Sequence, residues 1–242
     1  MTTPTGGQLV SVEEARIRDA YTRRQQQLRD RVSSWSRPSY AYAMQDRERR
    51  VLTALQRLEV RLAETRVLEV GCGTGAWIRD FIKWGVPPEN IWAVDIQPEA
   101  VHEARHRSAA GVHLECCSAT SLPFAAASFD LVLQATMFSS ILEPAVRRLV
   151  AAEMLRVARQ DGSILWYDLR VNNPWNSDVR GVGRAEVAEL FPGCRIDLRR
   201  IELAPPLARR IAPRSHFLWL LLTSVPWLCT HYLGVIRKSG AN

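Results

Sequence analysis

The stretch Val67-Leu68-Glu69-Val70-Gly71-Cys72-Gly73-Thr74-Gly75 reads as a buried strand that runs into a glycine turn. Its apolar residues are typical of a parallel strand that is covered on both faces. The three glycines let the backbone come close to a ligand, because no Cβ stands in the way. A helix that follows such a turn points its free N–H groups at that ligand. The stretch therefore predicts an α/β fold with a nucleotide-like cofactor site.

The spacing of the glycines distinguishes this turn from the turn of dinucleotide-binding folds. Those folds usually show G-x-G-x-x-G, with a phosphate at the helix N-terminus. Here the spacing is G-x-G-x-G, and Glu69 stands two residues before the first glycine. A carboxylate at that place disfavours a pyrophosphate and suits a cationic ligand.

At this motif the chain resembles the class I S-adenosylmethionine (SAM) methyltransferases, whose first motif has the form E/D-x-G-x-G-x-G. The resemblance implies that Gly71, Cys72, Gly73 and Gly75 lie along the methionine part of SAM. It also implies that Glu69 holds the amino group of SAM, directly or through water. The alternative is a tight strand-to-helix turn that binds no ligand.

Two further segments extend the resemblance. Asp95 ends an expected strand, and a carboxylate about 20 residues after the glycine turn can accept both hydroxyls of a ribose. The resemblance implies that Ile96 packs on the adenine. Residues 117–124 fall where many family members read G-D-A-x-x-L-P-F, but Ser118 replaces the aspartate. Adenine contact is then expected from Ser118 and Ala119, from backbone groups or from water.

The segment 129–137 resembles the fourth motif of the family, and Gln134 is expected near the cofactor. Ser139 and Ser140 stand where some relatives carry a histidine pair, so no histidine base is expected there. The tetrad of amino-group methyltransferases and the aspartates of metal-dependent catechol enzymes are absent, so no metal is expected. The remaining candidates for a general base are Asp168, His216 and His231, each of which could instead have a structural role.

Alternating strand and helix patterns predict a doubly wound, seven-stranded, mostly parallel sheet of the Rossmann-like class. The resemblance implies that the final strand is antiparallel and lies between the fifth and sixth. Residues 1–62 are expected to form a tail and an N-terminal helical cap, with helices over 11–31 and 44–62. Residues 63–242 are expected to form the SAM-binding core, with an apolar insertion at about 205–230. That insertion could be a lid over the acceptor, could pack on its own core, or could touch a membrane surface with nearby arginines.

The composition narrows the classes of function and the cellular locations that the sequence favours. The net charge is +7, and lysine occurs only at Lys83 and Lys238. Because the arginines are spread along the chain, a compositional bias explains them better than a nucleic-acid site does. Five cysteines without a C-x-x-C pair and a polar N-terminus favour a cytoplasmic protein without a signal peptide.

The sequence therefore predicts a SAM-dependent methyltransferase that acts on a small, bulky or apolar acceptor, with oxygen favoured as the target atom and carbon next. Secondary-metabolite, quinone and glycan biosynthesis are the expected settings. An RNA methyltransferase, a non-catalytic SAM-binding protein and an NAD-type dehydrogenase remain alternatives. The oligomeric state is left open.

Overall fold

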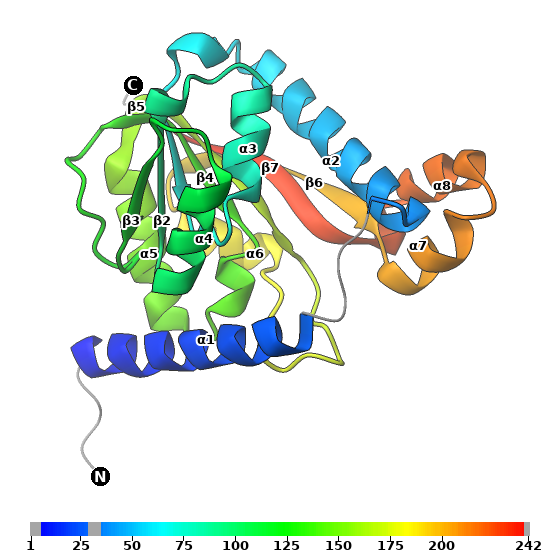
Figure 1. Cartoon of the computed structure of the whole chain (residues 1–242), viewed down its shortest axis with the longest axis horizontal. Coiled ribbons are helices and arrows are strands. Elements are labelled where there is room, and N and C mark those ends of the chain that lie inside the picture. Colours follow the sequence, from blue (N-terminus) through cyan, green and yellow to red (C-terminus); the bar gives the residue numbers. More distant parts are fainter. Residues whose placement is uncertain (1–5, 29–34, 240–242) are drawn as a thin grey trace.

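Seven strands form one sheet in the order β3-β2-β1-β4-β5-β7-β6 (Figure 1). The computed structural model describes residues 6–28 and 35–239. The strands are β1 (Val67–Val70), β2 (Ile91–Asp95), β3 (His113–Cys116), β4 (Phe129–Ala135), β5 (Ala158–Leu169), β6 (Cys194–Leu203) and β7 (Cys229–Lys238). Strand β7 is antiparallel to both β5 and β6, while the other pairs are parallel. The predicted fold class and the position of the last strand are confirmed.

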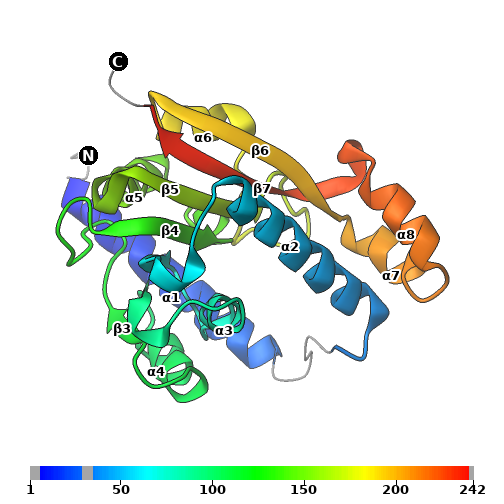
Figure 2. The ribbon, with the colours of Figure 1, turned by 90° about the horizontal axis from the view of Figure 1, so that it is seen from above.

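Helices cover both faces of this sheet (Figures 1 and 2). The α-helices are α1 (Gly6–Leu28), α2 (Pro38–Arg57), α3 (Ala76–Lys83), α4 (Pro98–Arg107), α5 (Pro144–Val157), α6 (Arg184–Leu190), α7 (Pro205–Ile211) and α8 (His216–Thr223). Short 3-10 helices are η1 (Leu62–Glu64), η2 (Pro88–Asn90), η3 (Phe138–Ser140) and η4 (Pro226–Leu228). One apolar core joins the sheet to α5 and α6, and another joins its opposite face to α2, α3 and α4. The result is a three-layer α/β/α arrangement.

Local sequence explains the central elements. Every residue of β1 is buried, as expected for a strand with helices on both sides. Proline occupies the first turn of α2, α4 and α5, where its missing N–H costs no helical hydrogen bond. Because the strands of the parallel part end at one edge, their carboxyl ends gather the glycine turn, Asp95 and Asp168 there.

The N-terminal helices differ from the predicted bounds. Helix α1 begins at Gly6 instead of residue 11, because Val10 and Ile17 pack against the core and extend the helix. Residues 29–31 of the predicted helix lie outside the described residues. Helix α2 begins at Pro38 instead of residue 44 and ends at Arg57 instead of residue 62.

Between β6 and β7 the chain forms α7, α8 and η4, at the end of the molecule far from α4 and β3 (Figures 1 and 2). Trp219 is buried in a small core with Leu203, Ala208 and Ala212, and Tyr42 of α2 packs against it. This insertion therefore rests on the start of α2. Among the helices in the described residues, none combines the length and the apolarity that crossing a membrane requires.

Candidate active site

The glycine turn has the backbone conformation that its sequence predicts. Gly71 has φ +78°, and a Cβ added there would lie 2.8 Å from Cγ of Met137. Gly73 has φ +51°, and a Cβ added there would have no atom within 4 Å. The left-handed conformation explains why glycine is needed at both positions. The open space beside Gly73 is a cradle in which a ligand can approach the backbone.

Asp95 is fixed at the end of β2 by this turn. One carboxylate oxygen accepts a hydrogen bond from the Gly73 N–H at 2.8 Å, and the other accepts from the Gln97 N–H at 2.9 Å. Burial raises the pKa of Asp95, although these backbone donors oppose the shift. The carboxylate is thus held beside the glycine turn, as a ribose-binding role requires.

Glu69 brings a second carboxyl group to the same turn. It is 2% exposed, and its Oε2 has no hydrogen-bond partner within the described part of the chain. Burial raises its pKa well above the ordinary value, and the charges of Asp95 and Asp80 raise it further. Arg47 and Arg79 oppose this shift. A ligand with a cationic group would relieve both the missing partner and the repulsion between the carboxylates.

A pocket with an empty volume of about 640 Å³, part of it open to solvent, lies against the end of β2. The predicted cofactor residues that line it are Gly71, Asp95, Ile96, Ser118 and Ala119. The predicted residues that do not line it are Glu69, Cys72, Gly73, Gly75 and Gln134. Gln134 is fully buried, where its side-chain amide donates to the Tyr167 carbonyl and its oxygen accepts from the Met137 N–H. Gln134 thereby supports the turn behind the pocket.

Helix α1 forms the outer wall of this pocket. Glu14, Ile17 and Tyr21 line the pocket from α1, and Glu14 accepts a hydrogen bond from the Ser118 hydroxyl. The spacing i, i+3, i+7 puts these three side chains on one stripe of the helix. Sequence reasoning missed them, although that stripe is visible in the sequence. No residue of 205–230 lines this pocket, so α1 covers it in place of the apolar insertion.

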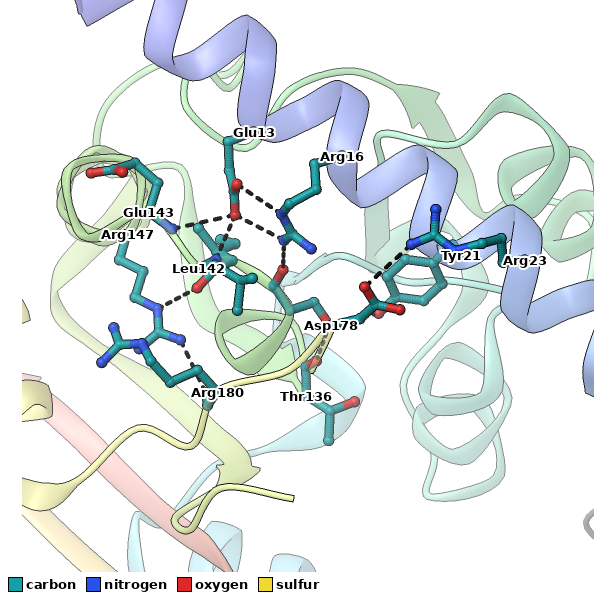
Figure 3. Close-up of polar contacts among 12 residues, drawn as sticks. Glu13, Arg16, Tyr21, Arg23, Thr136, Leu142, Glu143, Arg147, Asp178 and Arg180 are labelled. Atoms are coloured by element: carbon teal, nitrogen blue, oxygen red, sulfur yellow. Dashed lines mark hydrogen bonds and ion pairs between the residues drawn. The ribbon is translucent and has the colours of Figure 1, made fainter. Parts of the chain in front are cut away.

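The carboxylate of Glu13 fastens α1 to the loop after β4 (Figure 3). It accepts hydrogen bonds from the backbone N–H of Leu142 at 2.5 Å and of Glu143 at 3.3 Å, and it pairs with Arg16 at 2.9 Å. Arg16 also donates to the Ser140 carbonyl at 2.5 Å. Burial alone would raise the pKa of Glu13, but the bonds from Arg16 and the two N–H groups outweigh it and lower the pKa.

We expect Glu13→Gln to loosen α1. Hydrogen bonds to a charged group contribute about 1.5–3 kcal/mol each, so hydrogen exchange in α1 should become clearly faster. Because the pKa of Glu13 is lowered in the folded protein, its stabilisation is present above the ordinary carboxyl pKa and is lost as the pH falls through the folded value. Arg23→Gln is the control, since it removes only the exposed Arg23–Asp178 pair and should change α1 exchange little. Equal effects of the two substitutions would refute this role of Glu13.

Asp168 lies at the end of β5 and is 0% exposed. Its oxygens accept hydrogen bonds from the N–H groups of Ser139 at 3.2 Å and Leu169 at 2.8 Å. Desolvation by burial raises its pKa to about 6, against the opposing effect of these bonds and of Arg147. The carboxylate faces backbone groups of η3 and does not line the pocket described above, which favours a positioning role over that of a base.

The raised pKa of Asp168 predicts a particular pH dependence. Between about pH 4 and pH 6 the folded protein binds more protons at this group than the unfolded chain does, so ionisation costs folded stability as the pH rises. The free energy of unfolding of the wild type, measured relative to Asp168→Asn, should fall by roughly 3 kcal/mol across this range and stay level above it. Urea unfolding of both proteins at several pH values checks this. A constant difference would show that the pKa is not raised.

His231 stands beside a partner that the sequence did not reveal. Its Nδ1 lies 3.2 Å from Oε2 of Glu202, and the Tyr167 hydroxyl donates to Oε1 of Glu202 at 2.5 Å. The rings of Tyr167 and His231 stack with centroids 5.2 Å apart. Nδ1 also contacts the hydroxyl of Thr230, while Nε2 has no hydrogen-bond partner in the described residues. Glu202 has φ +63°, a strained conformation of the kind that functional sites often retain.

The electrostatics of this group keep the imidazole neutral. Burial lowers the pKa of His231, and Arg47 lowers it further, while Glu202 opposes both. Burial also raises the pKa of Tyr167 well above its usual value, so its hydroxyl stays a donor. A carboxylate that orients Nδ1 leaves Nε2 free to accept a proton.

Strand register relates this group to Glu69. Glu69 on β1 is level with Leu133 on β4, which is level with Leu165 on β5. Tyr167 lies two residues beyond Leu165, so it is on the same face of the sheet as Glu69. Two strand spacings separate them, which is about 10 Å sideways.

Arg47 and Trp77 lie between the glycine turn and Tyr167. The Arg47 guanidinium lies 4.4 Å from the Trp77 ring centroid and 5.7 Å from that of Tyr167. Trp77 belongs to α3, directly after the glycine turn. Packed side chains of Arg47, Trp77 and Tyr167 therefore connect the helix after the glycine turn with the His231 group.

His216 is placed elsewhere. It is exposed at the start of α8, where its ring lies 4.7 Å from that of Tyr42. Its position in the insertion separates it from the residues that line the pocket. Within residues 6–28 and 35–239, no group of three or more His, Cys, Asp or Glu side chains is arranged to hold a metal ion.

Comparison with known proteins finds similar methyltransferase domains. A family model described as a methyltransferase domain matches residues 67–162, from β1 into β5. A phthiotriol/phenolphthiotriol dimycocerosates methyltransferase from Mycobacterium ulcerans is 32% identical over 126 residues, which are 50% of this chain and 45% of that protein. A malonyl-[acyl-carrier protein] O-methyltransferase from Herminiimonas arsenicoxydans is 31% identical over 138 residues, which are 56% of this chain and 50% of that protein.

The fold is shared more widely. A solved structure of a SAM-dependent methyltransferase from Methanosarcina mazei aligns with a TM-score of 0.56 and 15% identity, and it covers 76% of this chain and 96% of that chain. Such a likeness shows the arrangement of the sheet and its helices. The chain spans about half the length of the curated relatives it matches.

Proposed function

This chain carries a class I SAM-dependent methyltransferase domain, and from that premise we propose that it transfers a methyl group from SAM to a small, apolar acceptor. The observation that carries the proposal is the pair of carboxyl groups, the buried Glu69 and the half-buried Asp95, beside the open cradle at Gly73. The unpaired thiols suit a reducing compartment such as the cytoplasm.

The residues present fit SAM as the ligand. The unpartnered Oε2 of Glu69 would accept a hydrogen bond from the amino group of SAM. Asp95 would accept the ribose hydroxyls, and Ile96 and Ala119 offer apolar surface to the adenine. When bound, SAM supplies a methyl carbon attached to a positively charged sulfur, which is a good leaving group. The two carboxyl groups thus match a ligand with more cationic than anionic groups.

Oxygen is our favoured target atom because His231 is arranged as a base. Glu202 orients the imidazole through Nδ1, and Nε2 would accept the proton of an acceptor hydroxyl as the oxygen–methyl bond forms and the sulfur–methyl bond breaks, which leaves a neutral thioether. Arg47 and Trp77, between the glycine turn and Tyr167, would line the acceptor's path. Holding the acceptor in line with the methyl group contributes most of the rate, since proximity can lower a barrier by ~7–11 kcal/mol.

The names of the relatives support an apolar or acyl acceptor. One is named as a phthiotriol/phenolphthiotriol dimycocerosates methyltransferase, and the other as a malonyl-[acyl-carrier protein] O-methyltransferase. Both matches cover only part of those proteins, so the acceptor of this chain is proposed by analogy.

The proposal is tested by incubating the protein with methyl-labelled SAM and fractionated extract of its source. We expect label in an organic-extractable, low-molecular-weight fraction, in a product that resists mild base as an ether does. A base-labile product would indicate a methyl ester. SAM binding without label in any fraction would favour a non-catalytic SAM-binding protein.

An RNA methyltransferase is the second candidate, and one observation favours it. A groove with an empty volume of about 1040 Å³ lies between α2 and strands β6 and β7. Of its arginines, Arg57, Arg195, Arg199 and Arg237 have no acidic partner within 4.0 Å in the described residues. Label in the RNA fraction, together with RNA affinity that falls steeply with salt, would support this candidate and contradict the small acceptor.

A further inference from the structure

The insertion between β6 and β7 exposes large apolar side chains that its own small core does not use. Phe217 is 77% exposed, Leu221 is 54% exposed and Trp227 is 78% exposed. Trp219 on the same helix is 1% exposed, so α8 buries one side and presents the other to solvent. Helix α8 carries no Asp, Glu, Lys or Arg. Neighbouring apolar side chains exposed together mark an interaction surface.

The charged side chains of the insertion itself are all basic. No Asp or Glu occurs after Glu202 in the sequence. Arg209, Arg210 and Arg214 are exposed on or directly after α7, next to α8. Arg200 lies over the exposed Trp227 ring, 4.8 Å from its centroid. Apolar side chains flanked by arginines suit a surface that offers both hydrocarbon and negative charge.

The shape of the insertion favours a bilayer over a protein partner. Helices α7 and α8 lie beyond the end of the sheet (Figures 1 and 2). Peptide partners usually enter grooves, whereas the headgroup region of a bilayer receives protruding aromatic and aliphatic side chains. Tryptophan and phenylalanine are well suited to that boundary.

We propose that the face formed by Phe217, Leu220, Leu221 and Trp227, with Arg209, Arg210 and Arg214 beside it, docks on the surface of an anionic lipid bilayer. It lies in the interface and does not span the bilayer, since α7 and α8 are only 7 and 8 residues long. The evidence for the docking surface consists of these exposed apolar side chains and the arginines beside them. Its purpose, access to acceptors dissolved in lipid, rests on the proposed function.

The geometry of the strands connects this face to the candidate active site. The insertion leaves β6 after Leu203 and enters β7 at Cys229, which are paired in the sheet. Glu202 directly precedes Leu203, and His231 lies two residues after Cys229. A docked insertion would therefore hold the His231 group within a few residues of the bilayer surface.

Sedimentation with lipid vesicles, in the absence of SAM, tests the docking. The probes are vesicles of phosphatidylcholine alone and vesicles with about 30% phosphatidylglycerol. We expect the wild type to bind the anionic vesicles more tightly, and Phe217→Ser with Leu221→Ser to weaken that binding at least about tenfold. The matched control is Val12→Ser, which removes an apolar side chain 69% exposed on α1 and should leave binding unchanged.

The arginines are tested with a second matched pair of variants. Replacing the three arginines of the insertion by glutamine should weaken binding to anionic vesicles by about 10- to 100-fold. The same replacement of Arg195, Arg199 and Arg237, in the groove on the sheet, should have little effect. Equal loss in both triple variants would show attraction by net charge alone and would overturn the proposal.

Three controls make the result decisive. Melting curves and SAM titration should be unchanged in Phe217→Ser with Leu221→Ser, because neither residue belongs to the proposed site. Fluorescence of the wild type should shift to the blue on anionic vesicles, and Trp227→Phe should lose most of this shift. Failure of the wild type to bind vesicles would overturn the docking surface. So would the finding that the wild type is a dimer and that Phe217→Ser with Leu221→Ser makes it a monomer. Neither outcome would affect SAM binding, which tests the proposed function separately.

Discussion

His231→Gln is expected to lower the rate of methyl transfer by about 10²- to 10⁴-fold, which is the range that general-base catalysis contributes. SAM affinity should be unchanged, because His231 on β7 lies three strand spacings from Glu69 on β1. Since burial lowers the pKa of His231, the wild-type rate should be level at neutral pH and fall only in acid as the imidazole is protonated. Rates with a hydroxyl acceptor, measured across pH at saturating SAM, check this.

Glu202→Gln separates orientation from proton transfer. It keeps a hydrogen-bonding side chain but removes the charge that opposes the lowering of the His231 pKa, so the acid limb of the pH profile should move to lower pH. Arg47, Tyr167 and Thr230 also face His231 and stay in place. A loss of rate of this size in Asp168→Asn, together with an unchanged rate in His231→Gln, would identify Asp168 as the base instead.

Glu69→Gln is expected to weaken SAM binding by about 1.5–3 kcal/mol, or roughly 10- to 100-fold, because a charged hydrogen bond to the ligand is lost. The SAM-free variant should melt no lower than the wild type, since a buried group that resists ionisation becomes a neutral amide of the same shape. Titration calorimetry and melting curves of the two proteins provide the comparison.

The raised pKa of Glu69 gives this prediction a second readout. A cation that binds beside Glu69 stabilises the ionised form, so SAM binding should release a proton at any pH at which the free protein holds Glu69 protonated. Calorimetry in buffers of different ionisation enthalpy measures that proton. The release should disappear in Glu69→Gln, and SAM affinity of the wild type should fall as the pH is lowered. Equal affinity in both proteins would exclude Glu69 from the site.

The central fold could be predicted because its signals are local. The apolar run of β1, the glycine turn and Asp95 lie within 30 residues or so of one another, and a βαβ unit of this size follows from them. The limits of the outer helices could not be predicted in the same way. Val10 and Ile17 contact core residues that are distant in the sequence, and these contacts extend α1 to Gly6. Strand β5 begins at Ala158, within a polar stretch, because it pairs there with Phe129.

The candidate site was predicted only in part, for a similar reason. Asp95, Ile96 and Ser118 follow strands at positions that the motifs mark. Glu202 carries no such mark, because only the antiparallel pairing of β6 with β7 brings it to His231. The wall formed by α1 depends on the tether from Glu13 to the loop after β4. These contacts join residues far apart in the chain, and no motif spacing encodes them.

Titration of SAM into the wild-type protein, with NAD as the comparison ligand, is the most direct test of the SAM site at the glycine turn. We expect saturable binding of one SAM per chain and no detectable binding of NAD. Absence of SAM binding, or NAD binding of similar strength, would contradict the assignment of the glycine turn to a SAM site.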